Sequence, residues 1–184
     1  MKTLLTLLTC LFLLSPTVVM SETVKLKDVV KRDGLYYQKS SDVPFTGTVT
    51  GIVGGKINWR TVTGIVEGKI KKGKKDGPWI THYRNGQLRR KRTYKDGKLD
   101  GPWVYYYENG QLVEKVIYKN GKKDGPWVNY WENGQLRSKG TYKDSKREGP
   151  WVFSKKNGTK RFTKDYRGND EGTGTYKNNR KVSD

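Results

Sequence analysis

Short segments of alternating apolar and polar residues, separated by Asn-Gly or Asp-Gly pairs, fill most of the chain. In one example, residues 103–107 are followed by Asn109-Gly110, then by residues 112–118 and Asn120-Gly121. Asn-Gly and Asp-Gly between such segments are strong hairpin signals, because both residue types tolerate positive φ. The pattern therefore predicts β-strands at 103–107 and 112–118, joined by tight turns.

This pattern repeats every 24 residues. Gly-Pro-Trp starts at 77, 101, 125 and 149, and Asn-Gly-Gln-Leu follows in register in the first three units, with a decayed copy at 157–160. Fixed self-similarity of this length indicates a stacked array. Leucine-rich repeats have a similar period but need several leucines per unit, and these units have about one. The positions expected to define the repeat are Gly77, Trp79, Gly86, Leu88, Tyr94, Gly101, Trp103, Gly110, Leu112, Tyr118, Gly125, Trp127, Gly134, Leu136, Tyr142, Gly149 and Trp151.

Alternation assigns the residues of one unit to two faces of a sheet. Trp103, Tyr105 and Tyr107 fall on one face, and Val104 and Tyr106 fall on the other. In the second strand Leu112, Glu114, Val116 and Tyr118 share a face, so we expect Trp, Leu and Tyr to form the packed side.

Proline at 78, 102, 126 and 150 cannot donate a ladder hydrogen bond, so we expect it at the first residue or the edge of each strand. Upstream, residues 49–57 are nearly repeated at 62–70, which predicts two divergent strands of the same sheet. Asp33-Gly34 followed by residues 35–38 predicts a first hairpin.

These signals divide the chain after residue 21 into three parts. Residues 22–76 are expected to form an N-terminal cap with divergent repeats, residues 77–165 the regular array, and residues 166–184 a C-terminal repeat or cap with a polar tail. The tail at 177–184 is expected to be disordered.

Residues 1–21 have the pattern of a secretory signal peptide. Lys2 precedes an apolar run of leucines, which is followed by Pro16 and small residues. The best cleavage point lies between Ser21 and Glu22. We therefore expect an extracytoplasmic protein, periplasmic or secreted, with no membrane span after the segment is removed.

Positive charge is the main feature of the composition. The full chain carries a net charge of +20, and removal of Lys2 with the signal leaves +19. Such a charge predicts attraction to polyanions, and stacking would align the lysine-rich turns into a basic ridge. A solvated edge that prevents edge-to-edge aggregation would explain the same lysines. The candidate anion-binding residues are Lys74, Lys75, Arg89, Arg90, Lys91, Arg92, Lys98, Lys122, Lys123, Lys146 and Arg147.

Candidate chemistry is sparse. Cys10 lies within the signal segment and His82 is the single histidine, so thiol chemistry and a histidine metal cluster are excluded. Carboxylates at Asp76, Asp100 and Asp124 recur with the repeat, which indicates turn formation rather than an acid/base pair. We therefore expect no catalytic residue, cofactor or metal. The expected partner is a protein or an anionic lipid or glycan surface, because export makes nucleic acid a poor fit.

The units resemble a known family. Residues 95–112 are similar to the MORN variant repeat of bacterial proteins often labelled YwqK-family antitoxins, and Tyr166-Arg167-Gly168 with residues 172–176 is similar to the ordinary MORN pattern. The resemblance implies an all-β fold, an elongated antiparallel β-meander of stacked 24-residue hairpins, and roles in protein contact or attachment to phospholipid membranes. It implies no catalytic residue. We expect an exported binding or scaffold protein; the alternative is a cytoplasmic antitoxin or immunity protein that neutralises a partner toxin.

Overall fold

The structure is a computed structural model that describes residues 22–57, 60–160, 162–164 and 170–183. The predicted signal segment, with Ser21 at its cleavage point, lies outside the described residues. Within them, no helix is long and apolar enough to cross a membrane.

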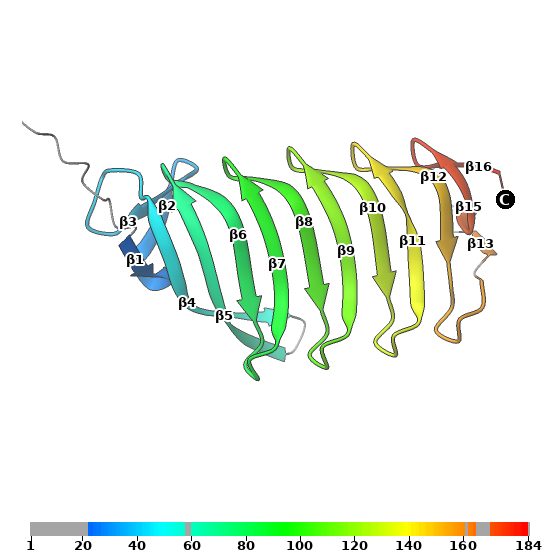
Figure 1. The fold of residues 1–184 in the computed structure, drawn as a ribbon, viewed down its shortest axis with the longest axis horizontal. Helices are drawn as coiled ribbons and strands as arrows, with labels where there is room; N and C mark the ends of the chain where they lie inside the picture. Colours follow the sequence, from blue (N-terminus) through cyan, green and yellow to red (C-terminus); the bar gives the residue numbers. More distant parts are fainter. Residues whose placement is uncertain (1–21, 58–59, 161, 165–169, 184) are drawn as a thin grey trace, which may run out of the picture.

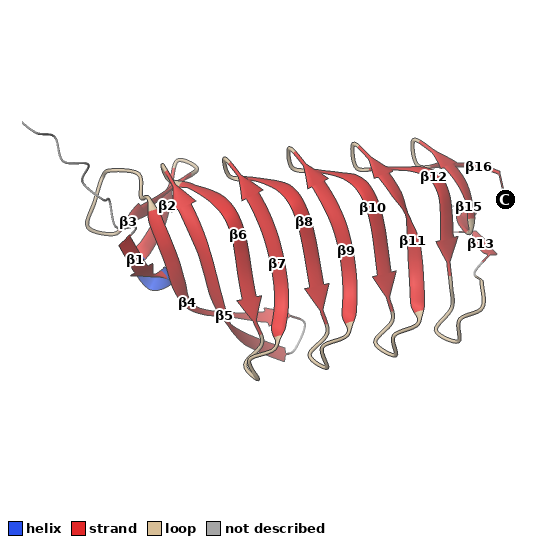
Figure 2. Ribbon diagram, viewed as in Figure 1, coloured by secondary structure: helices blue, strands red, loops and turns tan. Residues whose placement is uncertain are grey.

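The described chain is almost entirely β, as predicted (Figures 1 and 2). Its one helical element is a 3-10 turn, η1 (Leu26–Asp28). The strands are β1 (Glu22–Lys25), β2 (Val29–Arg32), β3 (Leu35–Gln38), β4 (Gly47–Ile57), β5 (Arg60–Lys71), β6 (Lys74–His82), β7 (Leu88–Lys95), β8 (Lys98–Tyr106), β9 (Leu112–Lys119), β10 (Lys122–Tyr130), β11 (Leu136–Lys143), β12 (Lys146–Phe153), β13 (Phe162–Lys164), β14 (Asp170–Gly172), β15 (Gly174–Lys177) and β16 (Arg180–Ser183).

Twelve of these strands form one long sheet in the order β1-β4-β5-β6-β7-β8-β9-β10-β11-β12-β15-β16. Strands β4 to β12 follow chain order, so the predicted meander is confirmed, and Figure 1 shows it as an elongated single layer. The sheet is mixed rather than wholly antiparallel, because β1 pairs in parallel with β4 at the N-terminal edge. A strand of four residues with no repeat pattern gave no signal for this pairing.

Tight turns close the hairpins where the sequence predicts them. Between β7 and β8, Asp96 and Gly97 both have positive φ, 49° and 82°. At the opposite edge, the Asn85 side chain accepts a 3.0 Å hydrogen bond from the Gln87 amide. Asp and Asn are favoured in such turns because their side chains tolerate this backbone region and cap nearby amides.

The proline prediction was wrong in position. Strand β8 begins at Lys98, so Pro102 lies within it rather than at its start. The register between β7 and β8 jumps from Tyr94↔Leu99 to Arg92↔Trp103, which places Gly101 and Pro102 in a β-bulge. Gly101 has φ 107° there. The bulge tolerates a residue without an amide hydrogen, because the extra residues are outside the regular ladder with β7; on the other side Pro102 pairs in register with Ile117 of β9.

A second bulge changes the faces. Between β8 and β9 the register shifts from Tyr105↔Glu114 to Tyr106↔Leu112. Leu112 therefore lies on the side of Val104 and Tyr106, and the prediction that it shares the Trp side was wrong. We call the side that carries Trp79, Trp103, Trp127 and Trp151 the Trp face, and the opposite side the lysine face.

Side chains also join successive repeats. The Tyr83 hydroxyl donates to the Tyr106 carbonyl at 2.7 Å, and the Tyr107 hydroxyl donates to the Tyr130 carbonyl at 3.1 Å. Trp131 continues the series through its indole N–H, which lies 3.3 Å from the Ser154 carbonyl oxygen. These bonds fix the spacing between units.

The two ends of the array are packed more fully than its middle. At the N-terminus, the core consists of Val24, Phe45, Val49, Val66, Ile70 and Trp79. The predicted hairpin β2–β3 is present, and its Tyr36 amide donates to the Gly73 carbonyl at 2.8 Å. At the C-terminus, Trp151 and Tyr176 are buried. The tail expected to be disordered instead contributes β16, which pairs with β15.

Candidate functional site: cationic surfaces on both faces

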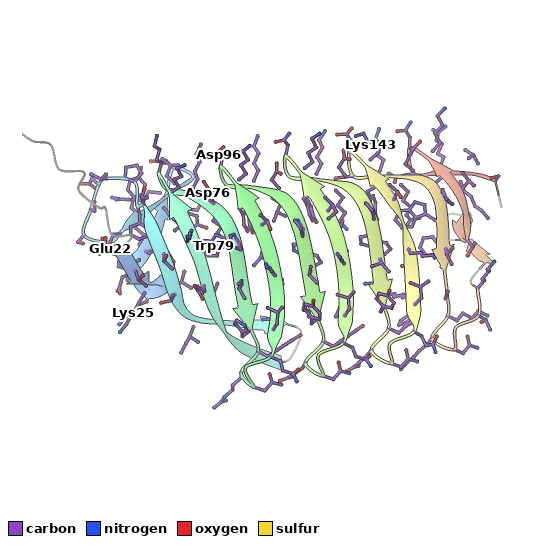
Figure 3. All side chains as sticks on the ribbon, viewed as in Figure 1. Glu22, Lys25, Asp76, Trp79, Asp96 and Lys143 are labelled. Carbon is purple, nitrogen blue, oxygen red and sulfur yellow. The ribbon has the colours of Figure 1, made fainter. Side chains whose placement is uncertain are left out.

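The exposed turn lysines form the predicted ridge along one edge of the sheet. Lys74, Lys98, Lys122 and Lys146 are all exposed, and Asp96 and Lys143 mark this edge in Figure 3. Carboxylates interrupt the ridge: Lys122 lies 3.3 Å from Asp144, and Lys143 lies 2.9 Å from Asp124. The hydrogen bond from Lys143 lowers the pKa of the Asp124 carboxyl and raises the pKa of the Lys143 amine. The ridge is therefore partly neutralised.

In three of the four turns the residue after the ridge lysine is also a cation, and its side chain lies over aromatic rings of the Trp face; the fourth turn has Leu99 at this position. The Lys75 amine lies 4.2 Å from the centre of the Trp79 ring, and Arg147 lies 5.2 Å from that of Trp151. Lys123 lies 5.1 Å from the ring of Tyr142. Burial lowers the pKa of Lys75 to about 8, helped by the nearby charges of Arg92 and Lys31.

The run at 89–92 is divided between the two faces. Arg89, Arg90 and Arg92 lie on the Trp face because the bulge at the start of β7 adds one residue, whereas Lys91 lies on the lysine face. Arg90 lies 5.3 Å from the ring centre of Tyr105.

These three arginines are not neutralised. Their Nε atoms are buried without a hydrogen-bond partner, and none of the three forms an ion pair with any part of the chain that the structure describes. Burial lowers the pKa of Arg90, and the charges of Arg92 and Arg89 lower it further.

A regular row of lysines on the lysine face was not predicted from the sequence. Lys91 pairs with Val104, which pairs with Lys115, and the alternation continues through Val128, Lys139 and Val152. All three lysines are exposed and none forms an ion pair among the described residues. Two strand spacings separate neighbouring lysines by about 10 Å. Recurrence of Lys at 91, 115 and 139 inside predicted strands was the signal that could have revealed the row.

An apolar groove runs between two of these lysines. It has a volume of about 800 Å³ and is lined by the aliphatic side chains of Ile117, Val128 and Val152, together with Lys115 and Lys139. Because the sheet has a single layer, nothing in the described structure covers these aliphatic side chains. The lysine face thus combines regularly spaced charge with accessible apolar surface.

The recurring carboxylates brace turns, as their repetition indicated. Asp100 accepts a hydrogen bond from the Asn120 amide at 3.3 Å, and Glu148 accepts one from the Asn178 amide at 3.1 Å. Among the residues described here, no three His, Cys, Asp or Glu side chains gather in a way that could hold a metal ion.

Comparison with known proteins identifies the repeat. Residues 75–96, 99–120 and 123–144 each match the family model of the MORN repeat variant. Repeats of this kind generally serve binding and scaffolding rather than catalysis. No curated protein matches the chain. The similarity to YwqK-family antitoxins therefore stays a prediction.

Proposed function

We propose that this MORN-variant repeat protein is an exported binding protein that attaches to an anionic surface of the cell envelope through its lysine face. The row formed by Lys91, Lys115 and Lys139 carries the proposal. A flat face with evenly spaced, unpaired lysines suits an extended anionic surface better than it suits one small ligand.

The strength of the attachment can be worked out from its electrostatic part. A lysine held near an anionic membrane contributes about 1 kcal/mol, so three contribute about 3 kcal/mol, or roughly a hundredfold in affinity. The aliphatic lining beside Lys115 and Lys139 adds favourable contact with the apolar boundary of lipid headgroups. Lysine stems can lie along that lining while their amines reach the phosphates.

Vesicle co-sedimentation tests the proposal. The chain from Glu22 to Asp184 is mixed with phosphatidylcholine vesicles that contain or lack phosphatidylglycerol, at low and at physiological salt. The variant Lys91→Gln/Lys115→Gln/Lys139→Gln removes the row. Lys74→Gln/Lys98→Gln/Lys146→Gln is the matched control, because it removes three exposed turn lysines and the same net charge.

We expect binding that requires phosphatidylglycerol, weakens with salt, and falls roughly a hundredfold in the row variant but much less in the control. Equal losses in both variants would reduce the attachment to net charge alone and reject the lysine face. Binding of neither vesicle at low salt would reject the anionic surface and favour a protein partner.

A further inference from the structure

The Trp face contains a pocket, and one of its lining residues, Glu114, accepts a hydrogen bond from Lys123 of the same face. The pocket has a volume of about 330 Å³ and is lined by Glu114, Trp127, Asn129, Trp131, Arg137, Ser138, Phe153 and Ser154. Its volume lies at the lower end of the range for small-molecule sites. Asn129 pairs with Ser138, directly next to the pair of Val128 and Lys139. Because successive side chains in a strand point to opposite faces, the pocket and the lysine row lie on opposite faces of the sheet.

The pocket exists because one repeat departs from its neighbours. The position two residues after the repeat tryptophan is Tyr105 in the previous unit and Phe153 in the next, but Asn129 here. Ser138 likewise stands where the previous unit has Glu114. Two small polar residues therefore replace bulky ones, and they leave space between Trp127, Trp131 and Phe153.

Polar groups in the pocket lack protein partners. Asn129 is 9% exposed and Ser138 is 4% exposed, yet neither side chain forms a hydrogen bond with any residue that the structure describes. Neither residue has a fully buried, unpartnered side-chain N or O atom, so the polar atoms of both side chains still reach the solvent in the pocket. Such groups at the floor of an open pocket are placed to bind a ligand or water.

The remaining walls supply flat aromatic surface and balanced charge. Arg137 lies 4.5 Å from the ring centre of Trp131, and Glu114 accepts hydrogen bonds from Trp127 and Lys123. One carboxylate and one guanidinium line the pocket, so its lining has no net charge although the protein has a charge of +20.

We propose that this pocket binds a neutral sugar residue of a glycan. The amide, the hydroxyls, the carboxylate and the guanidinium provide both donors and acceptors, as a ring of hydroxyl groups requires. The C–H groups on the flat side of a sugar ring can pack against the negative faces of Trp127, Trp131 or Phe153. An anion would instead favour the unpaired arginines on β7.

Titration with neutral oligomers of glucose, galactose and N-acetylglucosamine, followed by tryptophan fluorescence and ligand-observed NMR, tests this site. We expect saturable binding of at least one series. Asn129→Ala should weaken that binding by about tenfold, because a buried hydrogen-bonding group is lost. Ser138→Ala should act in the same direction.

Thr81→Ala is the matched control, since Thr81 is buried at the equivalent position two repeats earlier and away from the pocket. It should leave sugar binding unchanged. Thermal unfolding of each variant shows whether it is folded; Asn129→Ala should be no less stable than the wild type, because no protein partner is lost. The row variant Lys91→Gln/Lys115→Gln/Lys139→Gln should bind sugar normally, which separates this site from vesicle attachment.

Several results would overturn the proposal. The proposal is wrong if none of the neutral sugars binds, or if the wild type and Asn129→Ala bind sugar with equal affinity. It is also wrong if glucuronic acid or glucose 6-phosphate binds more tightly than glucose. The last result would assign the pocket to an anion.

Discussion

Replacement of Trp151 by alanine should destabilise the C-terminal end of the array more than any equivalent change at its centre. Trp151 is 1% exposed. Its ring centre lies 4.9 Å from that of Tyr142, 5.3 Å from Trp127 and 5.7 Å from Phe153. Trp103, by contrast, is only partly buried, and among the residues that the structure describes it has one aromatic neighbour, Tyr105, at 6.3 Å.

The magnitude follows from the buried surface. A buried tryptophan removes about 200 Å² from water, which at about 25 cal/mol per Å² corresponds to about 5 kcal/mol. Large-to-small core replacements give about 3–5 kcal/mol. Trp103→Ala should cost less than Trp151→Ala, because Trp103 is only partly buried and so removes less surface from water.

Urea denaturation and hydrogen exchange measure the two variants. In a repeat array, stability depends on nearest-neighbour contacts, so Trp151→Ala should expose β12, β15 and β16 to exchange while β6 to β9 stay protected. A cost below about 1 kcal/mol for Trp151→Ala, or equal costs for the two variants, would refute the assignment of stability to the aromatic contacts of Trp151.

Three further predictions concern single positions. A Cβ at Gly140 would overlap the Trp151 ring, so Gly140→Ala should destabilise the wild type by about 1–3 kcal/mol. The cost should be much smaller in a Trp151→Ala background, which a double-mutant cycle by urea denaturation measures. An unchanged cost would contradict the overlap. Ser145 has φ 67° where the equivalent turns have Gly97 and Gly121, so Ser145→Gly should stabilise the fold by about 0.5–1 kcal/mol, less any loss of the 3.0 Å hydrogen bond from the Lys123 amide to its hydroxyl; a lower unfolding midpoint would contradict this. The pKa of Lys75 is lowered to about 8 from the 10.5 of an unperturbed lysine, so its charged form opposes folding below pH 8 and this cost disappears as the pH rises toward 10.5. The free energy of unfolding of the wild type, relative to that of Lys75→Met, should therefore increase from pH 8 to pH 10. A constant difference would contradict the lowered pKa.

The repeat could be predicted from the sequence because each unit contains its own signals. Asp96-Gly97 and Asn85-Gly86 specify turns locally, and alternation between them specifies strands. The bulges were not predictable in the same way. Gly101-Pro102 reads as a strand start, but pairing with β7 on one side places it in an irregular segment of a longer strand.

The candidate surfaces were predicted only in part for a related reason. The charges at 89–92 are adjacent in sequence, and a one-residue bulge decides which face each occupies. The 24-residue spacing of Lys91, Lys115 and Lys139 could have predicted the row, but the lysine-rich turns have the same period and were chosen instead. The pocket around Asn129 depends on rings from two neighbouring repeats, so no single unit reveals it.

Export and envelope attachment can be tested together by fractionating cells that make the full-length protein. The envelope is extracted with salt, and the mass of the extracted chain is measured. We expect a chain that begins at Glu22, sediments with the envelope and is released by high salt. An intact chain that begins at Met1 and stays in the cytosol would contradict both export and envelope attachment, and it would make neutralisation of a cytoplasmic toxin the leading hypothesis.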